Sequence, residues 1–170
     1  SSAASDVYKR QQAIGVEVAD FTYTQQTHTT NVKRVYARER GQSFPETDGM
    51  ITDVPGICLV TSYADCVPLY FVDPVKKVIG LSHSGWRGTV GKIGKVTVEK
   101  MEEEFGCDPA DILGAVGPSI CQDCYEVSED VIDQFREAFE EKYWDVLFYR
   151  KPDGKYQLNL WEANRRIFLD

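Results

Sequence analysis

The sequence predicts one layered α/β domain, and three short apolar runs near its middle carry this prediction. The runs are Ile57–Tyr63, Val67–Val72 and Val78–Leu81, and each is bounded by proline, glycine or aspartate. Short β-branched runs with such boundaries are typical of strands rather than helices. Because the runs are almost continuously apolar, we expect both faces of their sheet to be buried, as in the middle of a layered protein.

Two further strands are expected before these runs, at residues 21–25 and 32–37, where the pattern suits extended chain. Residues 1–11 are polar and have no apolar period. We therefore expect a disordered or non-native tail there, without a structural role. One domain would then occupy residues 12–170, a length that suits a single hydrophobic core.

Helices and strands share the second half of the chain. Residues 90–105 place apolar side chains at intervals of three or four, which predicts an amphipathic helix. Ser128 is a good N-cap for another helix, with acidic residues in its first turn. The remaining expected elements are a strand at 112–116, a hairpin of 146–150 with 156–160 around Asp153-Gly154, and a helix at 161–169.

Composition narrows the classes of partner. The chain is 42% hydrophobic and 27% charged, as is ordinary for a globular protein, and its net charge of −8 argues against binding nucleic acid. It holds no run of membrane-spanning length and no apolar signal core. Five cysteines at irregular spacing fit free thiols in a reducing cytoplasm better than a disulfide framework. We expect a cytoplasmic monomer or weak homo-oligomer that binds small molecules and no membrane.

Reactive side chains lie at the ends of the central strands. Asp65 and Cys66 stand between two apolar runs, and His83 follows the third. Ser84–Thr89 then forms a glycine-rich turn that contains Arg87 and enters a helical pattern. Cys66 and His83 could be a nucleophile with its base, two ligands of a metal, or a core cysteine beside an incidental histidine.

His28 adds a third candidate ligand. It is one of only two histidines and lies at the end of a predicted strand, amid hydroxyl and amide side chains. Together with Cys66 and His83 it makes a set of two nitrogens and one sulfur, which suits Zn²⁺. Three protein ligands leave a fourth position open, as in catalytic rather than structural zinc sites.

Cys121 and Cys124 form a C-x-x-C pair that invites a structural-zinc or a redox interpretation. No second closely spaced pair accompanies them, because Cys58 and Cys107 stand alone. A structural zinc site is therefore disfavoured, and a redox pair stays open.

Several motifs in order give the chain a specific resemblance. They are Gln26-Thr27-His28, Thr47-Asp48-Gly49-Met50, Ala64–Leu69, His83–Thr89, and Gly117–Ile120 followed by Cys124–Val127. From about residue 12 to its end the chain resembles the laccase-domain, or multicopper polyphenol oxidase-like, proteins, which are now regarded as purine nucleoside phosphorylases. The resemblance implies an α/β/β/α layer order with mixed sheets, and one zinc ion held by His28, Cys66 and His83.

The resemblance also implies an activity. Members phosphorolyse adenosine, inosine and guanosine to the free base and ribose 1-phosphate, and the same site is associated with adenosine deamination and methylthioadenosine cleavage. Two departures stand out. Family members are longer at both ends, so the chain looks truncated, which would leave sheet edges unpaired. Cys121 occupies a position where a small residue is expected.

The parts of the site suit these reactions in different ways. A zinc-bound water is a nucleophile for deamination. Arg87, with the backbone N–H groups of Gly88 and Thr89, offers an anion site for phosphate, unless Arg87 pairs with an acidic residue and only holds the turn. Asp65 could orient a histidine or move a proton, or merely stabilise its turn.

Three alternatives to a zinc-dependent phosphorylase remain. The first is a hydrolase that uses Cys66 as nucleophile and His83 as base. The second, a copper-dependent phenol oxidase, would need many more histidines than the two present. The third is an inactive, truncated binding fragment.

Overall fold

The computed structural model describes residues 13–170, so the tail predicted at residues 1–11 lies outside the described part. A five-stranded sheet forms the centre, in the order β2-β4-β7-β6-β8. β2 and β4 run parallel and every other neighbouring pair runs antiparallel, so the sheet is mixed as expected. Its strands are β2 (Val32–Arg34), β4 (Gly49–Thr52), β6 (Val67–Asp73), β7 (Val78–Ser84) and β8 (Leu113–Val116).

Two smaller sheets flank the centre. One is parallel and has the order β3-β1-β5, with β1 (Phe21–Thr24), β3 (Ser43–Phe44) and β5 (Cys58–Val60). The other is antiparallel and has the order β10-β11-β9, with β9 (Glu126–Val127), β10 (Phe148–Arg150) and β11 (Tyr156–Leu158). The hairpin predicted around Asp153-Gly154 is therefore confirmed, although its first strand begins two residues later than expected.

The helices are α2 (Trp86–Val90), α3 (Ile93–Phe105), α4 (Glu129–Ala138), α5 (Trp144–Leu147) and α6 (Leu160–Leu169). Five short 3₁₀ turns connect the elements: η1 (Val18–Asp20), η2 (Ala37–Glu39), η3 (Pro109–Asp111), η4 (Gln122–Cys124) and η5 (Glu141–Tyr143). Within residues 13–170, none of the helices has both the length and the apolar character needed to cross a bilayer.

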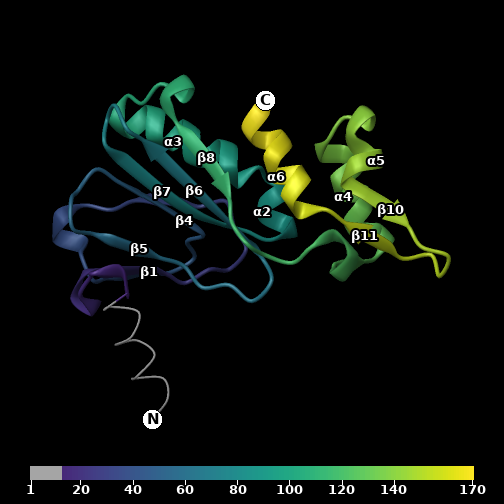
Figure 1. Ribbon diagram of the computed structural model, residues 1–170, viewed down its shortest axis with the longest axis horizontal. Coiled ribbons are helices and arrows are strands. Elements are labelled where there is room, and N and C mark those ends of the chain that lie inside the picture. The colour runs from purple at the N-terminus through teal and green to yellow at the C-terminus, as the bar shows by residue number, and fades with distance from the viewer. Residues whose placement is uncertain (1–12) are drawn as a thin grey trace, which may run out of the picture.

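Alternation along β4 explains the stacking of the layers. Ile51 belongs to the main core beneath the helices, whereas Met50, its neighbour in sequence, packs with Val35 and Ile57 in a second cluster. Successive side chains of a strand point to opposite faces, so β4 is sandwiched between α3 and the three-stranded sheet. Figure 1 shows this order, with α3 on one side of β4 and β7 and with β1 and β5 on the other. The mixed α/β class is thereby confirmed, and α2, α3 and α6 supply the helical layer that packs on the large sheet.

The expectation that both faces of the central strands are buried is wrong for β6. Leu69 and Phe71 are buried in the core, but Tyr70 is 45% exposed and Val72 42% exposed. The physical reason is the limited width of the three-stranded sheet. Its contacts with the large sheet gather around β4, so the outward side chains of β6 project beyond it.

The helix predicted at residues 90–105 is divided in two. Gly91 and Lys92 separate α2 from α3, and Lys92 has a left-handed backbone with φ of 56°. A Cβ atom on Gly91 would lie 2.6 Å from the Thr30 side chain, and one on Gly94 would lie 3.0 Å from the ring of Phe168. These glycines permit close packing against neighbouring segments, at the expense of a continuous helix.

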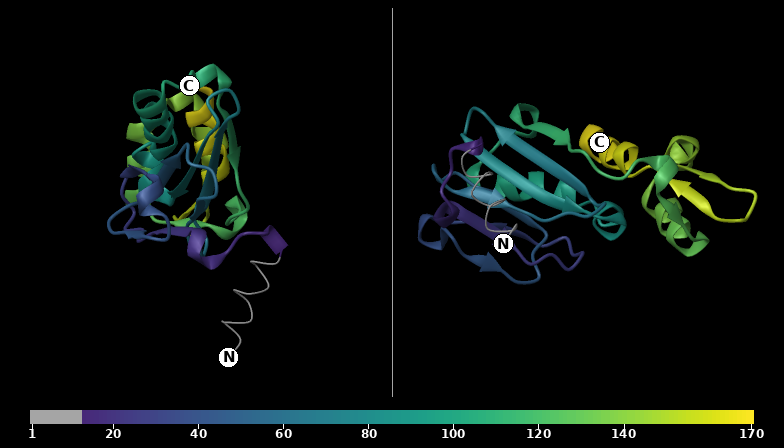
Figure 2. Two further views of the ribbon diagram at one scale, coloured as in Figure 1. Left: turned by 90° about the vertical axis from the view of Figure 1, so that its left-hand side faces the viewer. Right: turned by 60° about the horizontal axis from the view of Figure 1, so that its bottom comes forward.

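The C-terminal part forms a lobe beside the layered body. Figures 1 and 2 show α4, α5, β10 and β11 gathered there, with α6 lying between this lobe and α3. The main core nevertheless continues through both parts, because Ile93 of α3 and Phe135 of α4 belong to one cluster of buried side chains.

Candidate metal centre

Three segments that are distant in sequence bring His28, Cys66 and His83 together. One potential ligand atom from each side chain lies within 4.8 Å of the other two. His28 lies in the loop between β1 and β2, Cys66 directly precedes β6, and His83 is the sixth residue of β7. The imidazole centroids of the two histidines are 5.1 Å apart. The predicted convergence is therefore present, and the group could bind a metal ion.

Buried Asp48 holds His83. The Nδ1 atom of His83 lies 2.9 Å from Oδ1 of Asp48, and the histidine backbone N–H donates to the Asp48 carbonyl at 2.7 Å. Burial lowers the pKa of His83 and outweighs the opposing effect of the carboxylate. With a neutral ring whose Nδ1–H donates to Asp48, Nε2 is the nitrogen left to face a metal.

Asp48 also shapes the loop that carries His28. Its carboxylate accepts hydrogen bonds from the backbone N–H groups of Thr27, His28 and Thr29, at 3.2, 3.1 and 2.8 Å, and from the Thr29 hydroxyl at 2.7 Å. Burial by itself would raise the pKa of Asp48, but the hydrogen bonds from Thr29 and His83 outweigh it and lower the pKa. One ionised carboxylate thus orients both histidines.

His28 has a strained backbone, with φ of 63° in the left-handed region. Such a conformation costs a non-glycine residue on the order of 1–3 kcal/mol, although histidine tolerates it better than most. The hydrogen bonds to Asp48 hold the turn in this shape. The strain is therefore maintained by the same carboxylate that orients His83.

Gly85 leaves room for the ligands to meet. A Cβ atom there would lie 3.0 Å from Sγ of Cys66 and 3.1 Å from Cδ2 of His28. Real Cβ atoms rarely approach other atoms so closely, so any side chain at this position would push Cys66 and His28 apart. The absence of a side chain at Gly85 therefore allows Cys66 and His28 to lie close together.

The thiol of Cys66 carries its proton at neutral pH. Burial raises its pKa, and the negative charges of Asp65 and Asp48 raise it further. A bound cation would reverse this effect by stabilising the thiolate. The donor set therefore suits a metal that binds imidazole and thiolate. Asp48 supplies the carboxylate that usually hydrogen-bonds to a histidine ligand in such sites.

The spacing of the ligands is compatible with zinc after a small adjustment. Ligands of a tetrahedral Zn²⁺ lie about 3.5 Å from one another, given bonds of about 2.1 Å to nitrogen and 2.3 Å to sulfur. The His28, Cys66 and His83 atoms lie within 4.8 Å of one another. Side-chain shifts of about 1 Å would close that gap, and the exposed side of His28 leaves the centre open to solvent.

The other predicted site residues are placed differently from the ligands. Arg87 is exposed, and its guanidinium lies over the Trp86 ring at 4.2 Å from the centroid. Within residues 13–170, Arg87 forms no ion pair, which argues against the alternative that it only pairs with an acid.

Gly88 and Thr89 are buried, and the Thr89 hydroxyl donates to the Gly85 carbonyl. Their contact with phosphate stays a prediction.

Asp65 is exposed, and its backbone carbonyl accepts a hydrogen bond from Ile120 N–H at 3.1 Å. The carboxylate that orients a histidine is Asp48 instead, and a proton-transfer role for Asp65 stays a prediction. The sequence pattern assigned no role to Asp48 itself. The signal for Asp48 was its place in one of the ordered motifs, directly before a strand.

Two tyrosines near the centre were also missed. The Tyr63 ring lies 5.5 Å from the His83 ring, and its hydroxyl contacts the Ser82 carbonyl at 3.3 Å. Burial raises the pKa of Tyr125, the charge of Cys66 raises it further and that of Arg87 lowers it, so this phenol lies near both.

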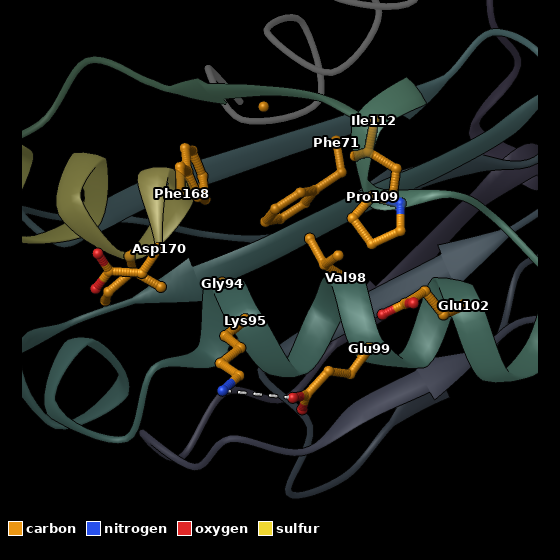
Figure 3. Close-up of a pocket in the computed structure, with 12 residues that line it drawn as sticks. Phe71, Gly94, Lys95, Val98, Glu99, Glu102, Pro109, Ile112, Phe168 and Asp170 are labelled. Carbon is orange, nitrogen blue, oxygen red and sulfur yellow. Dashed lines mark ion pairs between the residues drawn. The ribbon is translucent and has the colours of Figure 1, made fainter.

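An apolar pocket of about 260 Å³ lies elsewhere, between α3, β8 and the end of α6. Figure 3 shows Phe71, Val98 and Phe168 around it, with the ion pair between Lys95 and Glu99 at its margin. None of the three candidate ligands lines this pocket. The pocket is therefore interpreted as a packing gap beside α6. The reactive side chains His28, Cys66 and His83 lie at the candidate metal centre instead.

Comparison with known proteins supports one family. The family model described as multi-copper polyphenol oxidoreductase laccase matches residues 3–170. The purine nucleoside phosphorylase YlmD of Bacillus subtilis is 36% identical over 177 residues, covering 98% of this chain and 63% of that protein. A purine nucleoside phosphorylase of Deinococcus radiodurans is 43% identical over 155 residues, covering 91% and 57% respectively.

Another relative has a different name, and a solved structure has the same fold. Adenosine deaminase RL5, from an unknown prokaryotic organism, is 36% identical over 163 residues, covering 92% of this chain and 62% of that protein. The crystal structure of YlmD from Geobacillus stearothermophilus matches with a TM-score of 0.88 at 32% identity, covering 95% of this chain and 62% of that one. The chain spans about three fifths of the length of these relatives. On the strength of the matched model and these identities, it belongs to the multi-copper polyphenol oxidoreductase laccase family.

Proposed function

We propose that the protein is a zinc-dependent purine nucleoside phosphorylase that cleaves adenosine, inosine and guanosine with phosphate. The observation that carries the proposal is the convergence of His28, Cys66 and His83 around one point, supported by Asp48. Relatives named purine nucleoside phosphorylase, at 36% and 43% identity, support the reaction class. Because the chain spans only part of their length, the whole activity is part of the proposal.

A zinc ion held by the three ligands would supply a Lewis acid and, with its open position, an activated water. Asp48 keeps Nδ1 of His83 protonated and fixes the direction of its ring. Arg87 binds phosphate, because a dianion near an acidic protein needs a local cation with two parallel donors.

Adenosine deamination is a second activity of the same centre. It is supported by the relative named adenosine deaminase RL5, and the activated water that a bound zinc would supply suits replacement of the amine of adenine. Methylthioadenosine cleavage needs only that the phosphorylase accept a nucleoside modified at the ribose.

A cysteine hydrolase is the less favoured function. A nucleophilic cysteine needs a low pKa, whereas burial and two nearby acids raise the pKa of Cys66. The Nδ1 atom of His83 is hydrogen-bonded to Asp48, so Nε2 is the nitrogen that could either accept a proton or bind a metal. Copper-dependent phenol oxidation is disfavoured by the two histidines of the chain.

The test combines metal analysis with two assays of base release from inosine. Purified protein is loaded with Zn²⁺, its metal content is measured, and hypoxanthine release is followed with and without phosphate. Phosphate-dependent release together with ribose 1-phosphate supports the proposal. Release that needs no phosphate would favour the hydrolase, and zinc binding without any turnover would make this chain a binding fragment.

A further inference from the structure

We propose that Cys121 and Cys124 form a redox-active dithiol site, which exchanges electrons with small-molecule disulfides such as oxidised glutathione. The site lies in the turn between β8 and β9 and takes no part in the proposed phosphorolysis. It is independent of the metal centre, because neither cysteine belongs to the His28, Cys66 and His83 group.

The two sulfurs are already within reaction distance. The Cys121 Sγ lies 3.0 Å from the Cys124 Sγ, and Cys124 is exposed to solvent. Cys121 is partly buried, as are Cys58 and Cys66, and Cys107 is buried, so Cys124 is the one exposed thiol of the five. Of the five thiols, only this pair therefore combines a thiol neighbour with free access for a dissolved disulfide.

The surroundings make Cys121 the attacking sulfur. The hydrogen bond between the two sulfurs and the backbone N–H groups of Cys124 and Asp123 lower the pKa of Cys121, while the pKa of Cys124 is raised. A thiolate attacks disulfides and a thiol does not. The arrangement matches the division of labour in a C-x-x-C pair, in which the first sulfur attacks and the second resolves.

Hydrogen bonds hold the turn on both sides, so the sulfurs stay near each other. Ile120 N–H donates to the Asp65 carbonyl at 3.1 Å, and the Asp123 carbonyl accepts from the Gln157 side chain at 3.3 Å. The Asp123 carboxylate accepts from the Tyr149 hydroxyl at 3.1 Å. Within residues 13–170, no further His, Cys, Asp or Glu completes a metal-binding group with this pair. Redox chemistry is therefore the better use of the two thiols.

The exchange balances with oxidised glutathione as the oxidant. The Cys121 thiolate attacks one glutathione sulfur, the glutathione disulfide bond breaks, and one glutathione leaves and takes up a proton. Cys124 then gives up its proton, attacks the Cys121 sulfur and expels the second glutathione. Two electrons pass from the protein thiols to the oxidised glutathione, and one protein disulfide forms.

The first test equilibrates the protein at pH 7 in mixtures of reduced and oxidised glutathione, traps free thiols with iodoacetamide and maps the peptides by mass spectrometry. We expect a Cys121–Cys124 disulfide that appears and disappears reversibly with the glutathione ratio. Cys58 stays alkylated throughout. If Cys121 and Cys124 both remain alkylated in oxidised glutathione alone, or pair with other cysteines, the proposal is wrong.

The second test uses matched variants. Cys124→Ser removes the resolving sulfur, so Cys121 should stop at the mixed disulfide with glutathione, whereas Cys121→Ser should take up little glutathione at Cys124. Cys58→Ser is the control and should behave as the unchanged protein. We also expect iodoacetamide to modify Cys121 about tenfold faster than Cys58 at pH 7, because burial raises the pKa of Cys58. Equal rates at both thiols would overturn the assigned roles.

Discussion

Cys66 and Cys121 lie in neighbouring turns that a hydrogen bond connects, yet their thiols differ in chemistry. Burial and two nearby acids raise the pKa of Cys66, whereas hydrogen bonds with the Cys124 thiol and with neighbouring backbone N–H groups lower the pKa of Cys121. The first thiol holds its proton more tightly than an ordinary cysteine, and the second holds it less tightly. The difference shows that the surroundings of a cysteine decide whether its thiol suits metal binding or the redox role proposed for Cys121.

The largest expected effect is the loss of zinc affinity when a candidate ligand of the metal centre is replaced. Replacing Cys66 with Ser, or His83 with Ala, should weaken zinc binding by roughly a hundredfold or more, because a three-ligand site loses one ligand. Competition with a fluorescent chelator measures the affinity. Cys121→Ser is the matched control and should bind zinc normally. Equal losses in Cys66→Ser and Cys121→Ser would mean that the two regions are one site.

The next largest effect is expected at Asp48, which is hydrogen-bonded to the candidate ligands. Asp48→Asn keeps the size of the side chain but removes the charge that orients both histidines, so zinc affinity should fall about 10- to 100-fold. Glu46→Gln, at an exposed carboxylate two residues away, is the control and should change affinity little. Thermal unfolding of both variants separates loss of the fold from loss of the ligand geometry. An Asp48→Asn variant that is fully folded and binds zinc normally would contradict the role given to Asp48.

The third prediction sharpens the contrast in protonation. Because the pKa of Cys66 is raised, its thiol is protonated at pH 7, and zinc binding should release about one proton. His83, with a lowered pKa, is already neutral and releases none. Zinc affinity should therefore rise about tenfold per pH unit near neutrality, until the pH reaches the pKa of the thiol.

Calorimetry in two buffers of different ionisation enthalpy measures that proton. Cys66→Ser should remove most of the difference between the buffers, and Cys121→Ser should leave it unchanged. A zinc-binding heat that is the same in both buffers would show that Cys66 is already a thiolate without metal.

The smallest expected effect lies at Arg87, whose guanidinium lies over the Trp86 ring. Arg87→Lys keeps the charge but loses the two parallel donors, so the KM for phosphate should rise roughly 3- to 10-fold. Water-dependent deamination of adenosine should change less, because phosphate takes no part. Lys95→Arg, an exposed cation of α3 away from the centre, controls for charge. If both activities fall equally, Arg87 binds the nucleoside or supports the turn.

Much of the fold could be predicted from local patterns. The runs at 67–72 and 78–81 became β6 and β7, because β-branched residues bounded by turns favour extended chain irrespective of what packs on them. Burial could not be predicted in this way. Tyr70 and Val72 are exposed because the three-stranded sheet does not extend far enough to cover them. The residue pattern of β6 contains no information about the width of that sheet.

The sequence by itself determined the chemical nature of the metal centre. Two histidines and a cysteine at predicted strand ends provide nitrogen and sulfur donors that could hold a metal ion where they meet. Only the tertiary structure decided that they meet, that Asp48 holds two of them, and that Cys121 faces Cys124. These facts rest on hydrogen bonds and close contacts between segments distant in sequence, such as Asp48 with His83 and Gly85 with His28. Local propensity acts over a few neighbouring residues, whereas such contacts form only when the whole chain has packed.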